Sequence, residues 1–517
     1  MAEDTLCPRT SAVCLLNAVV ENLLEQVEIL SHCLIFFGCK STKKRLTLLA
    51  KKELSSSKTF DMTTTKKIAL PADFVSEMTN LLGTDEALQL FEGLETPCPT
   101  SVRCNEAKGY DTDGEPVAWC RTGRYLSERP QFTLDPLLHA GCYYVQEAAS
   151  MFVEQAFKAM GECPQRLLDL CASPGGKSTL WRSLLPDGAL LVANEPLRQR
   201  AMVLAENLAK WGQPDVVVSN AYPADFAPLT GFFDVIAADV PCSGEGMFRK
   251  DMGARNEWSV ENVRKCAELQ RSIIADVWPA LRQGGYLVYS TCTFNRSEDE
   301  DNVSYICDEL GAELIRLDVP EEWNVMGDTT GQGLPVYHFF PGKSRGEGFF
   351  LALLRKTSTT AGGGNRKYKK GVRELPLRNA SKLSGWLQNE ADYKFYAPDD
   401  SHVAAVRKSL YEDVQRLRNQ LKTVWAGVLL AEAKGQKWVP QQELALSQAL
   451  APEAFPRVEL SLDEALAYLR RDAITVDAPR GYVIVTYQGC PLGFVNNLGV
   501  RANNLYPPEW RIRKQLP

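Results

Sequence analysis

The sequence predicts an α/β fold in which a mostly parallel, doubly wound sheet carries helices on both faces. Between residues 164 and 356, short apolar runs of strand length alternate with segments of helical periodicity. A Gly-rich turn follows the first apolar run, and polar residues stand where the later runs end. Open α/β sheets bind ligands outside the carboxyl ends of their strands, so we expect the functional site at that edge.

The strands and helices of this region can be placed in order along the chain. Aliphatic residues dominate each strand, and Gly, Pro or Asp residues follow it. We expect strands at 167–170, 189–193, 216–219, 233–238, 286–290 and 348–355. We expect helices at 178–185, 199–211 and 260–281, with Gly284 and Gly285 after the last of them.

Composition divides the rest of the chain into four segments. Residues 1–67 are interpreted as an N-terminal extension, with a translation start at Met62 as the alternative. Residues 68–163 form a mixed α+β segment. Residues 357–377 form a basic, Gly-rich linker that either contacts phosphate or is merely solvated. Residues 378–517 form a C-terminal region that we expect to be helical at first and β-rich from Gly481.

The composition is typical of an intracellular globular protein. The chain has 517 residues, 45% hydrophobic and 24% charged, which is enough for about three domains. Its net charge of -6 means that any nucleic-acid-binding surface must be local. The 15 Cys residues show no paired Cys-x-x-Cys spacing and only 4 His accompany them, so we expect no metal site and a reducing cytoplasm. The acidic start and the short apolar run 29–38 predict neither a secretory signal nor a membrane span.

The Gly-rich turn after the first strand predicts a ligand cradle. Its residues are Cys171, Ala172, Ser173, Pro174, Gly175, Gly176 and Lys177. Backbone N–H groups point outward at such a helix start, and glycine lets a ligand approach closely. A phosphate-binding P-loop would need glycine at the position of Cys171, which disfavours a nucleotide hydrolase. S-adenosylmethionine (SAM) is the ligand that we prefer, and an ordinary β–α turn is the alternative.

A carboxylate ends the second strand. Glu195 lies 19 residues beyond Gly176. A carboxylate at this position accepts hydrogen bonds from ribose hydroxyls, which suits a dinucleotide or SAM. The alternative is a charge that caps the helix that begins after Pro196.

Two cysteines follow the fourth and fifth expected strands. The segment Asp239-Val-Pro-Cys242 ends one strand, and Cys292 ends the other within Ser-Thr-Cys-Thr. Adjacent strand ends can bring both thiols into one pocket beside a methyl donor. Two small apolar cysteines in a core would be the alternative explanation for either residue alone.

Paired thiols beside SAM have a chemical reason. Carbon 5 of cytosine is a poor nucleophile, but addition of a thiolate to carbon 6 makes carbon 5 enamine-like and able to attack a methyl sulfonium. A carboxylic acid, Asp239, can hydrogen-bond the N3/N4 edge of the base and support charge as the adduct forms. After methyl transfer the C5 proton leaves and the enzyme–base bond breaks, and a second thiol can assist that step.

These motifs resemble those of the Nol/Nop/Sun family of RNA 5-methylcytosine methyltransferases, and most of all its bacterial RsmF-type members, which modify small-subunit ribosomal RNA. The resemblance covers about residues 70–517. It implies that residues 171–177, Glu195 and Asp239 contact SAM. It also implies that Cys292 is the nucleophile and that Cys242 helps to release the product. The implied fold is a Rossmann-like methyltransferase domain at 164–356, an RNA-contacting segment at 68–163 and a PUA-like RNA-binding domain at the end of 378–517.

Two departures from the family pattern limit this transfer. The family often has an acidic residue after the third strand that contacts the adenine side of SAM, whereas this chain has Asn220 there and Asp225 a little later. We favour Asn220, because it directly follows the strand. The first sixty or so residues match no part of the family pattern.

The sequence therefore predicts a cytoplasmic, SAM-dependent RNA cytosine-C5 methyltransferase. Ribosomal RNA or the small ribosomal subunit is the favoured substrate and tRNA is the alternative; we expect a monomer without metal or membrane contact. One rival is a non-catalytic RNA-binding assembly factor that retains the fold, and a P-loop nucleotide hydrolase is a more distant one.

Overall fold

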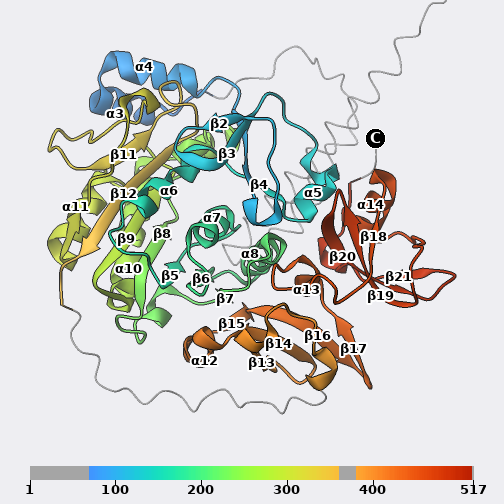
Figure 1. Cartoon of the computed structure of the whole chain (residues 1–517). Helices are drawn as coiled ribbons and strands as arrows, with labels where there is room; N and C mark the ends of the chain where they lie inside the picture. The colour runs from blue at the N-terminus through green and yellow to red at the C-terminus, as the bar shows by residue number, and fades with distance from the viewer. Residues whose placement is uncertain (1–68, 360–379, 515–517) are drawn as a thin grey trace, which may run out of the picture. The chain divides into compact units, whose positions relative to one another are not determined.

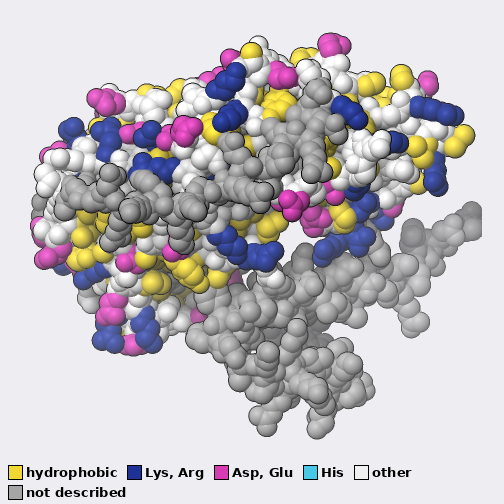
Figure 2. Space-filling view, turned by 90° about the horizontal axis from the view of Figure 1, so that it is seen from below, with side chains coloured by type: hydrophobic (Ala, Val, Ile, Leu, Met, Phe, Trp, Pro, Cys, Tyr) yellow, Lys and Arg dark blue, Asp and Glu magenta, His cyan; other side chains and the backbone are white. Residues whose placement is uncertain are grey.

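A computed structural model describes residues 69–359 and 380–514. The predicted extension 1–67 lies outside the described residues, and so does the basic part of the predicted linker. Figure 1 shows the central sheet with strands β5 to β9 side by side. On the face shown in Figure 2, Lys and Arg side chains are interspersed with Asp, Glu and apolar groups.

Nine strands of the described residues form the central sheet, in the order β10-β12-β9-β8-β5-β6-β7-β15, with β11 paired to β12. Neighbours from β7 to β9 run parallel, and the strands at both edges join antiparallel. Their bounds are β5 Arg166–Asp169, β6 Leu190–Asn194, β7 Val216–Ser219, β8 Phe233–Asp239, β9 Leu281–Thr291, β10 Ala312–Leu314, β11 Val336–Phe339, β12 Phe349–Lys356 and β15 Thr423–Ala426.

Helices cover both faces of this sheet, as predicted. One apolar core contains residues of α10, α11 and α12, and the other contains residues of α6, α7 and α8. Strands buried on both faces explain the continuous aliphatic runs in the sequence. The helices are α6 Val153–Lys158, α7 Gly176–Leu184, α8 Arg198–Trp211, α9 Met252–Glu257, α10 Val260–Val277, α11 Glu300–Leu310 and α12 Tyr411–Gln420.

The boundary between α10 and β9 differs from the prediction. The helix was expected to reach residue 281, but α10 ends at Val277 and a 3-10 turn carries the chain to Ala280. Pro279 explains the difference, because its ring and its missing N–H stop an α-helix. β9 accordingly begins at Leu281, five residues before the predicted strand.

The N-terminal segment is mixed α+β, with a four-stranded sheet among its described residues in the order β2-β3-β1-β4. Its elements are α3 Ala72–Leu82, α4 Thr84–Gly93, β1 Thr100–Cys104, β2 Glu115–Val117, β3 Cys120–Leu126, α5 Pro136–His139 and β4 Tyr143–Val145. The aromatic side chains of Phe74, Phe248 and Trp258 pack together. The first helix of the segment is thereby fixed to the chain that follows β8.

The C-terminal region is β-rich almost from its start, so the expectation of an initial helical part is wrong. Strands predominate there, and one of them, β14 His402–Arg407, is buried at four consecutive positions. Besides α12 and β15, which pack on or join the central sheet, its described elements are β13 Tyr393–Tyr396, β14 His402–Arg407, β16 Val428–Lys434, β17 Lys437–Pro440, α13 Gln442–Leu446, β18 Arg457–Glu459, α14 Leu462–Leu469, β19 Gly481–Tyr487, β20 Cys490–Asn497 and β21 Ala502–Asn504. In the described part of the chain, no helix is both long and apolar enough to cross a membrane.

Candidate active site

The carboxyl ends of the parallel strands bring the predicted polar residues to one edge of the sheet. In the strand register, Asp169 of β5 lies beside Ala237 of β8, and Asp239 of β8 lies beside Ser290 of β9. The residues at or just beyond this edge are Asp169, Glu195, Asn220, Asp239 and Cys292. Four of these residues, all but Asp169, are ones that the sequence singled out, and they lie at the edge where the sequence predicted the site.

The turn from β5 to α7 is shaped by glycine and anchored by a side chain. Gly175 has a φ of +118°, a conformation that residues with a Cβ rarely adopt, and α7 begins at Gly176. Ser178 Oγ donates to Asp169 Oδ2 at 2.6 Å and ties the first turn of α7 to the end of β5. Burial raises the pKa of Asp169 to about 7, the Ser178 hydrogen bond opposes this shift and the Asp239 charge adds to it. The turn is a preformed cradle at a helix N-terminus.

Arg103 of β1 supports this cradle from the N-terminal sheet. It is fully buried, and its guanidinium donates to Gln146 Oε1 at 2.9 Å, to Gly176 O at 3.3 Å and to Thr179 Oγ1. Burial lowers the pKa of Arg103 to about 10. Sequence reasoning missed Arg103, because an isolated basic residue in a short strand carries no recognisable pattern. Gln146, which directly follows β4, is the hydrogen-bond partner that orients the Arg103 guanidinium.

Glu195 is buried just after β6 and contacts the turn that leads into α8. Its Oε1 accepts from Leu197 N at 2.9 Å, and its Oε2 lies 3.4 Å from Arg200 Nε. Burial raises the pKa of Glu195, while the Leu197 hydrogen bond and the Arg200 charge oppose the shift. Glu195 holds the turn just before α8, whose N-cap is Leu197, so it is not itself the capping residue. The ribose contact stays a prediction.

The two candidates for the residue after the third strand have different surroundings. Asn220 Nδ2 donates to the carbonyl oxygens of Glu195 and Pro196, at 2.9 and 2.8 Å, so it lies against the Glu195 turn. The Asp225 carboxylate accepts from Tyr222 N at 2.8 Å and caps its own 3-10 turn. Asn220 is thus the candidate that lies next to Glu195.

Lys177 and Asp239 join the Gly-rich turn to the end of β8. Lys177 Nζ lies 2.9 Å from Asp239 Oδ2, and Ser290 Oγ donates to Asp239 Oδ1 at 2.8 Å. Burial alone would lower the pKa of Lys177, but the Asp239 carboxylate raises it overall. The lysine therefore stays charged and, with Ser290, orients the Asp239 carboxylate.

Cys242 and Cys292 lie with their sulfur atoms 3.0 Å apart. Both are partly exposed, unlike Cys104 and Cys120, which are buried in the N-terminal sheet. The neighbouring Cys292 thiol and burial raise the pKa of Cys242 well above its ordinary value. The structure thus brings together two cysteines 50 residues apart in sequence.

Glu245, a buried carboxylate on the loop that carries Cys242, accepts hydrogen bonds from the loop that carries Cys292. Glu245 Oε2 accepts from Phe294 N at 2.6 Å, and its Oε1 accepts from Asn295 Nδ2 at 2.9 Å. Gly246 N donates to Cys292 O at 2.8 Å, and a Cβ on Gly246 would lie only 2.8 Å from the same oxygen. Burial, with a contribution from the Glu298 charge, raises the pKa of Glu245 to about 8.

A second carboxylate makes the reciprocal contact. Glu298, beyond Cys292, accepts from Ser243 N at 3.0 Å, from Gln270 Nε2 at 2.6 Å and from Asn295 Nδ2 at 2.9 Å. The two loops are therefore fastened to each other by side chains from both sides, which fixes the approach of the sulfur atoms. Sequence reasoning missed this pair, although Glu245 lies only a few residues beyond Cys242. Among the described residues, no cluster of His, Cys, Asp and Glu could hold a metal ion.

Three segments of the chain match protein-family models. Residues 161–355 match the family described as 16S rRNA methyltransferase RsmB/F. Residues 70–148 match the N-terminal domain of 16S rRNA methyltransferase RsmF, and residues 455–512 match the methyltransferase RsmF PUA domain. The predicted fold class, with its C-terminal PUA-like domain, is confirmed.

Curated relatives extend over most of the chain. It is 31% identical over 484 residues to ribosomal RNA small subunit methyltransferase F of Erwinia tasmaniensis, an alignment that covers 87% of this chain and 98% of the relative. It is 35% identical over 410 residues to the protein of the same name from Klebsiella pneumoniae, covering 76% and 84%. The crystal structure of PH0851 is similar with a TM-score of 0.51 at 21% identity, covering 59% of this chain and 71% of that one. This last likeness concerns the fold alone.

Proposed function

Because the chain belongs to the RsmF-type family of ribosomal RNA small subunit methyltransferases, we propose that it methylates carbon 5 of a cytosine in small-subunit ribosomal RNA. The family supports an rRNA methyltransferase that uses SAM. The observation that supports the cytosine-C5 chemistry is the pair of sulfur atoms, 3.0 Å apart, at the same sheet edge as the Gly-rich turn. Methyl transfer to a nucleophilic nitrogen or oxygen would need no thiol, whereas carbon 5 needs one.

The residues of the sheet edge suit SAM. Gly175 and Gly176 leave the backbone of the turn open to a ligand, and Glu195 and Asn220 lie at the ends of the next two strands. When bound, SAM supplies an electrophilic methyl group. The Gly-rich turn would hold it at the start of α7, and Glu195 would accept from its ribose hydroxyls.

The two thiols have complementary tasks in this proposal. Cys292 adds through its sulfur to carbon 6 of the cytosine, which makes carbon 5 electron-rich enough to take a methyl group. Cys242 remains near the adduct and assists loss of the C5 proton, after which the bond between sulfur and carbon 6 breaks. The 3.0 Å separation supports a shared task, because both sulfur atoms can reach one pyrimidine ring. The assignment of the two roles follows the family resemblance.

Asp239 would act on the polar edge of the base. Its carboxylate is held by Lys177 and Ser290. In this position it can hydrogen-bond the N3/N4 edge and support the charge that develops as Cys292 adds to carbon 6. Lys177 is a positioning residue, since its contact is with Asp239.

RNA is the proposed partner, and the flanking segments are its proposed contacts. A pocket for one flipped base cannot select a site in a long RNA by itself. The segments matching the RsmF N-terminal and PUA models lie on either side of the catalytic segment in sequence. We propose that these segments supply the specificity, that ribosomal RNA is the substrate and that the protein acts as a monomer.

The test is methyl transfer with identification of the product. The full-length protein is incubated with isotope-labelled SAM and either unmodified small ribosomal subunits or total tRNA, and the nucleosides are separated by mass spectrometry. We expect labelled 5-methylcytidine in the small-subunit RNA, and none with the Cys292→Ala protein. Label in tRNA alone would move the substrate to tRNA. Label on another atom or base would contradict the C5 chemistry.

A further inference from the structure

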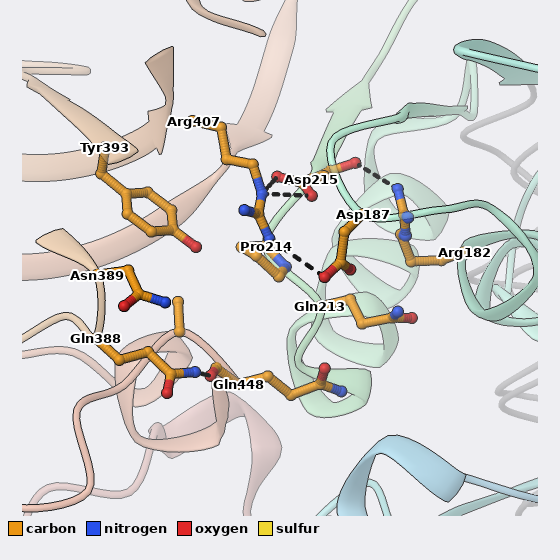
Figure 3. Close-up of a pocket in the computed structure, with 11 residues that line it drawn as sticks. Arg182, Asp187, Gln213, Pro214, Asp215, Gln388, Asn389, Tyr393, Arg407 and Gln448 are labelled. Carbon is orange, nitrogen blue, oxygen red and sulfur yellow. Dashed lines mark hydrogen bonds and ion pairs between the residues drawn. The ribbon is translucent and has the colours of Figure 1, made fainter. Parts of the chain in front are cut away.

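A polar pocket lies at the opposite end of the sheet from the two thiols. Figure 3 shows the side chains that line it. Asp187 and Asp215 come shortly before β6 and β7, and Arg182 lies in the last turn of α7. The pocket is therefore at the amino edge of these strands. Six residues of the C-terminal region close the other side: Gln388, Asn389, Tyr393, Arg407, Gln448 and Ala449. The pocket has a volume of about 180 Å³. This is room for about six water molecules, the scale of one planar heterocycle rather than of an oligonucleotide.

The charged groups of the pocket are already neutralised. Arg407 Nε lies 2.9 and 2.8 Å from the two carboxylate oxygens of Asp215, and Arg407 Nη2 lies 4.0 Å from Asp187 Oδ2. The terminal nitrogens of Arg182 donate to backbone carbonyls, among them those of Leu185 and Pro186. Two carboxylates beside two arginines leave no surplus positive charge, which disfavours phosphate or another anion as the ligand.

Several polar atoms of the pocket have no partner. Within the described part of the chain, Gln213 Oε1, Gln448 Nε2 and Arg182 Nε are buried and make no hydrogen bond. The Arg182 side chain is fully buried as well. Such groups are costly to leave unpaired. Each of these atoms has almost no exposed surface, so a ligand in the pocket reaches the two glutamine amides only after they rotate. Figure 3 shows the Tyr393 hydroxyl pointing into the same space from the other wall.

We propose that this pocket binds a single unpaired nucleobase. The groups that the lining offers are the amides of Gln213 and Gln448, which present a donor or an acceptor as they rotate, and the Tyr393 phenol, all of them neutral. A nucleobase edge presents donors and acceptors side by side in a flat ring, and proteins read unpaired RNA bases through such contacts. The base would come from the RNA substrate, in which case the inference rests on the proposed function, or from a free nucleoside.

The experiment measures binding and does not depend on methyl transfer. Full-length protein is irradiated with ultraviolet light in the presence of small ribosomal subunits, and cross-linked peptides are mapped by mass spectrometry. In parallel, the four ribonucleosides are tested by saturation-transfer NMR. The variant is the double substitution Gln213→Ala with Gln448→Ala. Gln332→Ala, an exposed glutamine outside the pocket, is the matched control.

We expect a nucleotide cross-linked to the peptide that contains Tyr393, with about a tenfold lower yield in the double variant and no change in Gln332→Ala. This cross-link without nucleoside binding identifies RNA as the source. Nucleoside binding that the double variant loses identifies a free ligand. If the double variant fails to fold, Tyr393→Phe replaces it, since that change removes only the hydroxyl and should weaken either signal.

The absence of both signals in the wild-type protein overturns the inference. A protein that methylates RNA but shows neither signal refutes the pocket alone. A protein that shows the cross-link but transfers no methyl group refutes the proposed function and leaves the pocket standing.

Discussion

Lys177 Nζ lies 2.9 Å from Asp239 Oδ2, although the two residues are 62 positions apart in sequence. One belongs to the Gly-rich turn after β5 and the other ends β8. Their contact joins the proposed SAM cradle to the proposed base-binding acid. A single ion pair thus couples the two halves of the site, and removing it should disturb the chemistry more than the binding of either ligand.

Lys177→Met tests this coupling. We expect kcat for RNA methylation to fall by about tenfold or more, because Asp239 loses the donor that orients its carboxylate. The dissociation constant for SAM should change much less. Lys177→Arg keeps the charge and should recover part of the rate. Lys265→Met, which removes an exposed ion pair with Glu261, is the control. Wild-type kcat in Lys177→Met would refute the positioning role.

Glu298→Ala tests the fastening of the two cysteine loops. The change leaves Ser243 N, Gln270 Nε2 and Asn295 Nδ2 without their common acceptor. Each buried donor left unpaired costs about 1–3 kcal/mol, so Tm should fall by several degrees and methylation should fall with it. Glu298→Gln retains one acceptor oxygen, so its Tm and its methylation rate should lie between those of the wild type and of Glu298→Ala. An Ala variant with unchanged Tm and activity would show that the loops need no such clamp.

Glu245 should make stability depend on pH. Its pKa is about 8 in the folded protein and 4.5 when exposed, so the folded state holds a proton that the unfolded state releases between these values. Stability from this group is therefore full below about pH 4.5 and is lost as the pH rises towards 8. Within that window one such proton is worth about 1.4 kcal/mol per pH unit. Tm of the wild type should fall from pH 5 to pH 8 more steeply than that of Glu245→Gln. Parallel curves for the two proteins would contradict the shift.

The sequence was most informative where local patterns decide the structure. The aliphatic runs of β5 to β8 are long enough to be recognised as buried strands, and parallel pairing then places Asp239 and Cys292 at one edge. The predicted end of α10 was wrong, because Pro279 stops the helix before Gly284 and Gly285 are reached. The prediction also failed in residues 380–440, where short strands carry too few apolar residues to be told from helices.

The supporting residues could not be predicted, because their roles arise from contacts between distant segments. Arg103 reaches Gly176 across 73 positions, and Glu298 reaches Ser243 across 55. A lone arginine or glutamate in a sequence is far more often a solvated charge than a buried anchor. Only the folded chain shows that these two side chains are buried and what they hold.

The most direct test of the account compares Cys242→Ala and Cys292→Ala. Each protein is incubated with SAM and unmodified small ribosomal subunits, and a denaturing gel is used to detect a covalent protein–RNA adduct. The account predicts that Cys242→Ala accumulates the adduct, because release is impaired, and that Cys292→Ala forms none. The reverse pattern would exchange the roles of the two thiols. If neither variant forms an adduct while the wild type methylates RNA, the covalent C5 mechanism is wrong.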